Sequence, residues 1–163
     1  MKVAYFAGGC FWCIAALLDT IDGVTKIVSG YSGGDEINPT YELVKSQKTG
    51  HRESIKVIYD ENVTSYEAVL KMFLSNIDPF DDGGQFIDRG HSYTTAVYYC
   101  NEYEKLLAEK YITLIEIESS KKCAVAIEPF KTFYEAEEYH QDFHLKNPHK
   151  IKEELENSGR LKK

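Results

Sequence analysis

The chain has 163 residues, of which 43% are hydrophobic, 13% aromatic and 28% charged, and this apolar content excludes an intrinsically disordered protein. Its 26 acidic and 19 basic residues give a net charge of −7, which argues against binding to nucleic acid or to an anionic membrane. The length is sufficient for one domain with a hydrophobic core. The four cysteines therefore suggest reactive thiols or metal ligands before structural disulfides.

An uncharged stretch over residues 3–18 follows Met1 and Lys2. It resembles an export signal only superficially, because its positive region is a single lysine and no small-residue cleavage site precedes Asp19. It is also shorter than the roughly 20 residues that span a bilayer. We interpret it as a buried strand followed by a buried helix, and we expect a cytoplasmic protein that does not associate with membranes.

Hydrophobic spacing predicts strands and helices in a mixed order. The predicted strands cover residues 3–6, 24–31, 54–59, 93–99 and 123–127. The predicted helices cover residues 10 to about 22, 41–46, 66–77, 101–114 and 134–143. Ser65 and Asn101 are expected to cap two of these helices, with Glu104 at the capping-box position of the second.

Two segments show no regular apolar spacing. Residues 78–92 are expected to form a long ordered loop, which in a compact domain is usually functional. Residues 149–163 form a charged tail that is expected to be partly frayed. The whole pattern predicts an α+β fold, a two-layer mixed α/β sandwich that forms a single catalytic domain over residues 1–163.

Cys10 follows two glycines at a predicted strand-to-helix turn. The first turn of a helix offers unpaired backbone N–H groups and the positive end of the helix dipole, which favour the thiolate form of a cysteine. The Gly-Gly turn before Cys10 and the Phe-Trp pair after it favour a reactive thiol over a structural cysteine. We therefore interpret Cys10 as a candidate nucleophile.

Cys13 forms a Cys-x-x-Cys pair with Cys10. One helical turn places such Cα atoms about 5–6 Å apart, which a disulfide can span. The pair could be a dithiol redox centre, half of a zinc site or a chance neighbour. A zinc site needs two further ligands, and His140 and His144 are the only histidine pair with suitable spacing. We expect these histidines to pack or to form hydrogen bonds instead.

Further polar and thiol-bearing residues are not specific by position alone. Cys100 and Cys123 stand at the ends of predicted strands and are expected to be small core residues. The others lie beside predicted strands, helices or the long loop: Glu53, Asp88, Tyr93 and Tyr41.

Six segments of the chain resemble one enzyme family. GGCFWC at 8–13 is similar to the Gly-Cys-Phe-Trp signature of type A peptide methionine sulfoxide reductases. The other segments occur in the family's order: SGYSGG at 29–34, NPTY at 38–41, TGHRE at 49–53, GGQFIDRGHSY at 83–93 and FYEAEEYHQDF at 133–143. Together they extend over most of residues 3–148, which makes the resemblance far more specific than one hexapeptide.

The resemblance implies a mechanism. Cys10 would attack the sulfoxide sulfur, release methionine and become a sulfenic acid. Glu53 corresponds to the family's glutamate, which must be a neutral acid to hydrogen-bond the sulfoxide oxygen, so its pKa is expected to be raised by burial. Tyr41 and Tyr93 correspond to the two tyrosines that bind this oxygen, and Asp88 to the aspartate that positions the substrate.

The resemblance also implies how substrates are selected. Phe11 and Trp12 would form an apolar slot for the S-methyl group of the substrate. With the oxygen donors fixed on one side, this slot would select the S epimer at sulfur.

The chain departs from the family pattern around this site. Ala15 stands where many relatives have a glutamate, and Lys45 stands where they often have a cysteine. Ser92 and Thr94 replace a glutamine and an arginine next to Tyr93.

The route that recycles the Cys10 sulfenic acid stays open. No cysteine follows Cys123 in this sequence, whereas many relatives have resolving cysteines near the C-terminus. Cys13 is favoured as the resolving residue by its proximity, Cys123 is a second candidate, and direct attack by an external thiol is the third.

The expected function is thiol-dependent reduction of methionine-S-sulfoxide, free or in oxidised proteins. The resemblance implies a monomer without a bound cofactor or metal. Its reductant would be an external thiol from a thioredoxin or glutaredoxin system, or dithiothreitol in vitro. Two alternatives are a thioredoxin-like thiol–disulfide oxidoreductase using Cys10 and Cys13, and a module that binds methionine-containing peptides without chemistry.

Overall fold

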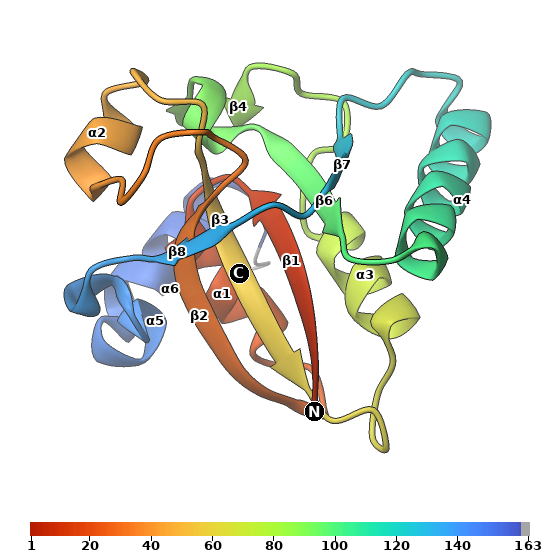
Figure 1. The fold of residues 1–163 in the computed structure, drawn as a ribbon, viewed down its shortest axis with the longest axis horizontal. Coiled ribbons are helices and arrows are strands. Elements are labelled where there is room, and N and C mark those ends of the chain that lie inside the picture. Colours follow the sequence, from red (N-terminus) through yellow and green to blue (C-terminus); the bar gives the residue numbers. More distant parts are fainter. Residues whose placement is uncertain (161–163) are drawn as a thin grey trace.

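The computed structural model describes residues 1–160, and a six-stranded sheet forms its centre (Figure 1). The strand order is β7-β6-β1-β3-β2-β8, and all neighbours are antiparallel except β6 and β7. The strands are β1 (Lys2–Gly8), β2 (Val24–Ser32), β3 (Arg52–Tyr59), β6 (Thr95–Tyr99), β7 (Ala126–Pro129) and β8 (Phe133–Glu135). A separate two-stranded hairpin is formed by β4 (Gly84–Gln85) and β5 (Asp88–Arg89).

The sheet is strongly curled. Only residues 130–132 separate β7 from β8, although these strands lie at opposite edges of the sheet. Six strands in a flat sheet would place those edges about 24 Å apart, whereas this connection can reach at most about 14 Å. In Figure 1 the connection crosses in front of β1 and β3. Phe130 covers this face of the sheet, where its ring stacks on that of Tyr5 at 4.0 Å between centroids.

Helices cover the opposite face of the sheet. The α-helices are α1 (Phe11–Leu18), α2 (Tyr41–Lys45), α3 (Tyr66–Ser75), α4 (Glu102–Ser119), α5 (Phe143–Lys146) and α6 (Pro148–Asn157). Short 3₁₀ helices occur at η1 (His91–Tyr93) and η2 (Glu138–His140). α1, α3 and α4 pack on the sheet and share one hydrophobic core with it. This arrangement confirms the predicted two-layer mixed α/β sandwich.

The predicted helix caps are present. The side chain of Ser65 accepts a hydrogen bond from Ala68 N–H at the start of α3. Asn101 accepts one from Glu104 N–H at the start of α4, and the Glu104 carboxylate accepts from Cys100 N–H. Each cap satisfies backbone donors that the first helical turn leaves without partners.

The predicted helix over residues 134–143 is wrong. Residues 134 and 135 belong to β8, which pairs with β2, residues 138–140 form η2, and a turn then leads to α5 at Phe143. The Gln141 side chain bonds the backbone N–H and C=O of Ser29, and the Glu137 side chain accepts a hydrogen bond from the hydroxyl of Tyr31. These contacts with the sheet outweigh the local helix propensity.

The expectation of a frayed tail from residue 149 is also wrong for the described residues. Residues 148–157 form α6, and Ile151 and Leu155 are buried on its inner face. Residues 161–163 lie outside the described part of the chain.

Two smaller differences concern strand positions. The last predicted strand, 123–127, is shifted and shorter, at Ala126–Pro129, and the predicted loop over residues 78–92 contains the β4–β5 hairpin.

Among residues 1–160, the structure has no helix with the length and apolar character needed to cross a membrane.

Candidate active site

Cys10 lies at the junction of β1 and α1. Its carbonyl oxygen accepts the N–H of Cys13 at 3.2 Å, so Cys10 is the N-cap of α1. The preceding Gly9 has φ +85°, and a Cβ on it would lie 2.7 Å from the Cβ of Gln85. Both the left-handed backbone and the close side chain require glycine at this turn.

A pocket of about 250 Å³ opens beside Cys10. It contains most of the residues that the sequence singled out, because β1, β3, α2, the β4–β5 hairpin and η1 converge there. The sequence-predicted residues that line it are Cys10, Trp12, Cys13, Tyr41, Glu53, Asp88 and Tyr93. The others are Lys45, Phe86, Ile87, Lys150, Glu154, Asn157, Ser158 and Arg160.

Glu53 is the acid of this pocket. It stands on β3 with 2% of its surface exposed, and its Oε1 accepts the backbone N–H of Phe11 at 3.2 Å. Burial, followed by the charge of Asp88, raises the pKa of Glu53 to about 8, against the opposing effects of Phe11 N–H, Tyr93 and Lys45. The expected buried carboxyl group with a raised pKa is confirmed.

Two phenols face the same acid. Tyr41 begins α2 and Tyr93 ends η1, and both line the pocket. Burial, followed by the charge of Glu53, raises the pKa of each hydroxyl above its ordinary value. Both hydroxyls therefore keep their protons at neutral pH and can donate hydrogen bonds to an oxygen atom in the pocket.

Trp12 forms an aromatic wall of the pocket. Its ring stacks on Phe143 with centroids 3.8 Å apart and planes 8° apart. Its indole N–H donates to His140 Nδ1 at 3.1 Å, which fixes the orientation of the ring. Phe11 differs from the expectation, because its side chain is fully buried and does not line the pocket. It packs against Trp12 and Tyr41 instead.

The prediction that the helix terminus stabilises a Cys10 thiolate is wrong for the reduced protein, in which Cys10 and Cys13 are both free thiols. A hydrogen bond to Cys13, burial, and the charges of Cys13 and Glu53 raise the pKa of Cys10 well above its usual range. The backbone N–H of Cys13 acts in the predicted direction but is the smallest of these effects. The hydrogen bond to Cys13, burial and the neighbouring charges together outweigh the stabilisation that the helix terminus gives to a thiolate.

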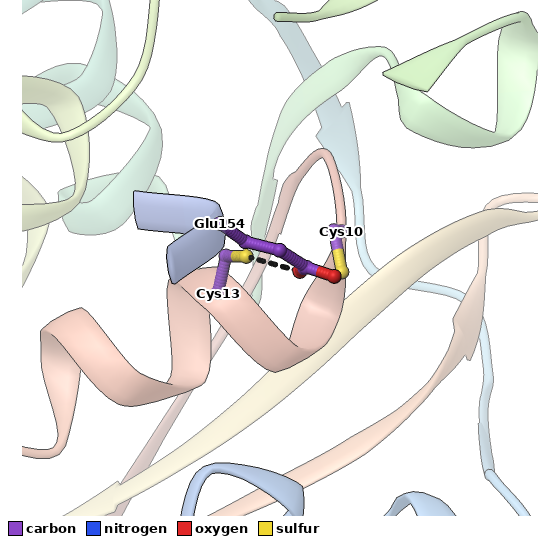
Figure 2. Close-up of side chains that lie close together, drawn as sticks. All are labelled: Cys10, Cys13 and Glu154. Carbon is purple, nitrogen blue, oxygen red and sulfur yellow. Dashed lines mark hydrogen bonds between the residues drawn. The ribbon is translucent and has the colours of Figure 1, made fainter. Parts of the chain in front are cut away.

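Cys13 lies next to Cys10 and Glu154, as Figure 2 shows. The two sulfur atoms and a carboxylate oxygen of Glu154 all lie within 4.8 Å of one another, and Cys13 Sγ donates a hydrogen bond to Glu154 Oε2 at 3.4 Å. Two sulfurs and an oxygen could bind a thiophilic cation. His140 and His144 are not part of this cluster, because His140 bonds Trp12 and His144 bonds Asp19 at 2.9 Å.

Neither remaining cysteine lies at the pocket. Cys100 is exposed before α4, and Cys123 follows α4, where its sulfur is 4.0 Å from the carbonyl oxygen of Ile112. Neither lines the pocket at Cys10. The arrangement therefore favours Cys13 over Cys123 as the partner of Cys10.

Asp88 belongs to the β4–β5 hairpin and lines the pocket. Its pKa is raised, mainly by burial and to a smaller extent by the charge of Glu154. The residues that depart from the family pattern have defined places. Lys45 lines the pocket. Ser92 bonds the Gln47 side chain, Thr94 accepts from Arg52 Nε, and Ala15 is buried in the core.

Two residues that build the site were missed by the sequence analysis. Glu154 gave no signal, because it lies in the charged segment that was expected to fray. Glu137 accepts hydrogen bonds from the N–H of Tyr41 and the hydroxyl of Tyr31. It lies in the FYEAEEYHQDF segment, so the match of this segment to the family was the signal that could have identified it. His140 forms a hydrogen bond with Trp12, as expected.

Comparisons with known proteins agree with this geometry. A family model described as peptide methionine sulfoxide reductase matches residues 2–163. A peptide methionine sulfoxide reductase MsrA of Bacillus licheniformis is 44% identical over 161 residues, which cover 98% of this chain and 89% of that protein. The MsrA of Bacillus subtilis is 45% identical over 161 residues, with 98% and 91% covered.

Solved structures show the same fold. Reduced Mxr1 from Saccharomyces cerevisiae superposes with a TM-score of 0.85 at 28% identity, covering 91% of this chain and 86% of that chain. Methionine sulfoxide reductase A of Corynebacterium diphtheriae superposes with a TM-score of 0.81 at 25% identity, covering 90% and 75%.

Proposed function

This chain belongs to the peptide methionine sulfoxide reductase family and reduces methionine-S-sulfoxide to methionine, and from that premise we propose that the pocket at Cys10 is where the reduction occurs. The observation that carries the proposal is the buried Glu53, whose pKa of about 8 supplies a neutral acid beside a cysteine and two phenols. This combination fits a reaction in which a thiol attacks sulfur while an oxygen gains a proton.

In the first step Cys10 Sγ attacks the sulfoxide sulfur. Glu53 protonates the sulfoxide oxygen, and this oxygen passes to Cys10 as the hydroxyl of a sulfenic acid. The substrate sulfur is reduced to the thioether of methionine, and Cys10 is oxidised. The proton that Cys10 loses restores the neutral form of Glu53, so the step balances without a cofactor.

The pocket walls orient the substrate. Tyr41 and Tyr93 donate hydrogen bonds to the sulfoxide oxygen, and Asp88 holds the polar side of the substrate. Trp12 contacts the S-methyl group. The pocket has hydrogen-bond donors on one side and an aromatic ring on the other. Only one epimer at sulfur can place its oxygen at the donors and its methyl group at the ring while its sulfur faces Cys10, so the pocket distinguishes the two epimers.

The sulfenic acid is then resolved by Cys13. Its sulfur lies within 4.8 Å of Cys10 Sγ, and a disulfide needs about 2.05 Å, so rotation of the two side chains can close the bond. An external dithiol of the thioredoxin type then reduces the disulfide. Mxr1 of Saccharomyces cerevisiae, a structural relative, has been crystallised in complex with Trx2. Such a cycle requires a reducing compartment, which fits the cytoplasm.

Single turnover tests this proposal. The reduced protein is freed of external thiol and mixed with excess L-methionine-S-sulfoxide, and the released methionine and remaining thiols are counted. We expect about one methionine per chain, two thiols lost and a Cys10–Cys13 disulfide in the peptide map. Cys10→Ser should release no methionine. If the parent protein releases none, the site assignment is wrong.

A further inference from the structure

The carboxylate of Glu154 connects the two cysteines of the site. We propose that Glu154 is a catalytic residue of the resolving step: it accepts the thiol proton of Cys13 and delivers it to the hydroxyl that leaves Cys10. This proposal rests on the function proposed above and adds a residue that none of the sequence motifs contains. Cys13 Sγ donates to Glu154 Oε2 at 3.4 Å, so the proton already points at this carboxylate.

The same carboxylate also reaches Cys10. The two sulfur atoms and a Glu154 oxygen lie within 4.8 Å of one another. In Figure 2 the end of the Glu154 side chain points between the two sulfur atoms. A carboxylate that is hydrogen-bonded to the proton donor and lies within 4.8 Å of the sulfur that carries the leaving hydroxyl is placed to transfer one proton between them.

α6 holds Glu154 in this position. Ile151 and Leu155 on its inner face form a small hydrophobic cluster with Cys10 and Cys13. Glu154 immediately precedes Leu155, so the packing of this helix directs the carboxylate toward the cysteines. Its side chain is half-buried at the wall of the pocket.

The chemistry of the step requires such a group. The sulfur–oxygen bond of the Cys10 sulfenic acid breaks, and a Cys10–Cys13 disulfide forms. The leaving hydroxide takes a proton to become water, and Cys13 must lose a proton to attack. One transfer through Glu154 satisfies both needs, and no external oxidant or reductant takes part.

Two variants separate this role from the first step. In Glu154→Gln, rapid mixing of reduced protein with L-methionine-S-sulfoxide should slow methionine release far less than it slows disulfide closure. Disulfide closure is measured by the loss of the second thiol. It should be about 10²-fold slower than in the parent protein, which is in the range that loss of a proton-transfer group produces. Dimedone should then trap the accumulated Cys10 sulfenic acid. Glu153→Gln removes the same charge from the exposed face of the helix and should behave like the parent.

A second comparison identifies the partner of Glu154. In Cys13→Ser the sulfenic acid should persist, and adding Glu154→Gln should not lengthen its lifetime further. Closure at the parent rate in Glu154→Gln would overturn the proposal, and so would equal slowing of methionine release and closure. Absence of methionine release in the parent protein and in every variant would instead refute the proposed function.

Discussion

The carboxyl group of Glu53 is surrounded by groups that favour different protonation states. The N–H of Phe11, the hydroxyl of Tyr93 and the charge of Lys45 lower its pKa, whereas burial and the charge of Asp88 raise it. Burial is the largest effect, and the resulting pKa of about 8 leaves roughly 90% of the group protonated at pH 7. Glu53 can therefore act as an acid where an ordinary glutamate would be a carboxylate.

Glu53→Gln should slow methionine release by 10² or more, because an amide keeps the hydrogen bond to Phe11 but cannot transfer a proton. The measurement is single-turnover release from reduced protein. The control is the rate at which a small disulfide oxidises Cys10 and Cys13. This rate should change little, because thiol–disulfide exchange involves no sulfoxide oxygen that an acid must protonate. Unchanged methionine release would contradict the role of Glu53 and would favour a thioredoxin-like activity.

Lys45 tunes this acid from the rim of the pocket. Its charge lowers the pKa of both Glu53 and Asp88. Lys45→Gln should therefore raise the pKa of Glu53, and the alkaline decline of methionine release should move to higher pH by a few tenths of a unit. Salt should reduce the difference, because Lys45 is exposed.

The pH dependence of single-turnover rates measures this shift. Lys48→Gln is the matched control, because Lys48 is exposed and does not line the pocket. A decline at the same pH in the parent and Lys45→Gln would show that Lys45 does not act on the proton of Glu53.

At the scale of elements, local patterns predicted most of the sheet and helices that hold Cys10 and Glu53. Strands β1, β2 and β3 and helices α3 and α4 follow from apolar spacing and from caps at Ser65 and Asn101. Residues 133–146 could not be predicted in this way, because their structure depends on contacts with distant residues such as Ser29 and Tyr31. α6 was missed because only two of its residues, Ile151 and Leu155, are buried and apolar.

α6 contributes to both stability and the site. Leu155→Ala should lower the free energy of unfolding by about 2–4 kcal/mol, because it leaves a cavity beside Cys10 and Cys13. Denaturation by urea measures this loss. Lys152→Ala on the exposed face of the same helix should change the free energy by less than about 0.5 kcal/mol. Equal small effects in both variants would mean that α6 is not packed on the cysteines in solution.

At the scale of the whole molecule, the order of the strands in the sheet brings the site together. Cys10 comes from the end of β1 and Glu53 from the start of β3, and these strands are neighbours in the sheet. Tyr93 precedes β6, the other neighbour of β1. The family motifs predicted which residues meet, but the strand order that makes them meet depends on long-range pairing that apolar spacing does not reveal.

The buried acid makes the stability of the molecule depend on pH. The pKa of Glu53 rises from 4.5 to about 8 on folding, so the folded state binds its proton more tightly than the unfolded state. The resulting stabilisation is complete below about pH 4.5, declines between pH 4.5 and 8, and is lost above pH 8. A shift of this size corresponds to at most ~5 kcal/mol.

Glu53→Gln should remove this dependence, because glutamine is neutral at every pH and can accept the same N–H of Phe11. The free energy of unfolding of the variant, minus that of the parent, should therefore increase from about pH 5 to about pH 9. Urea denaturation at several pH values measures the difference, with the lowered pKa values of Glu36 and Asp81 contributing equally to both proteins. A constant difference across this range would show that Glu53 titrates alike in the folded and unfolded states, and the acid would then have to be another group.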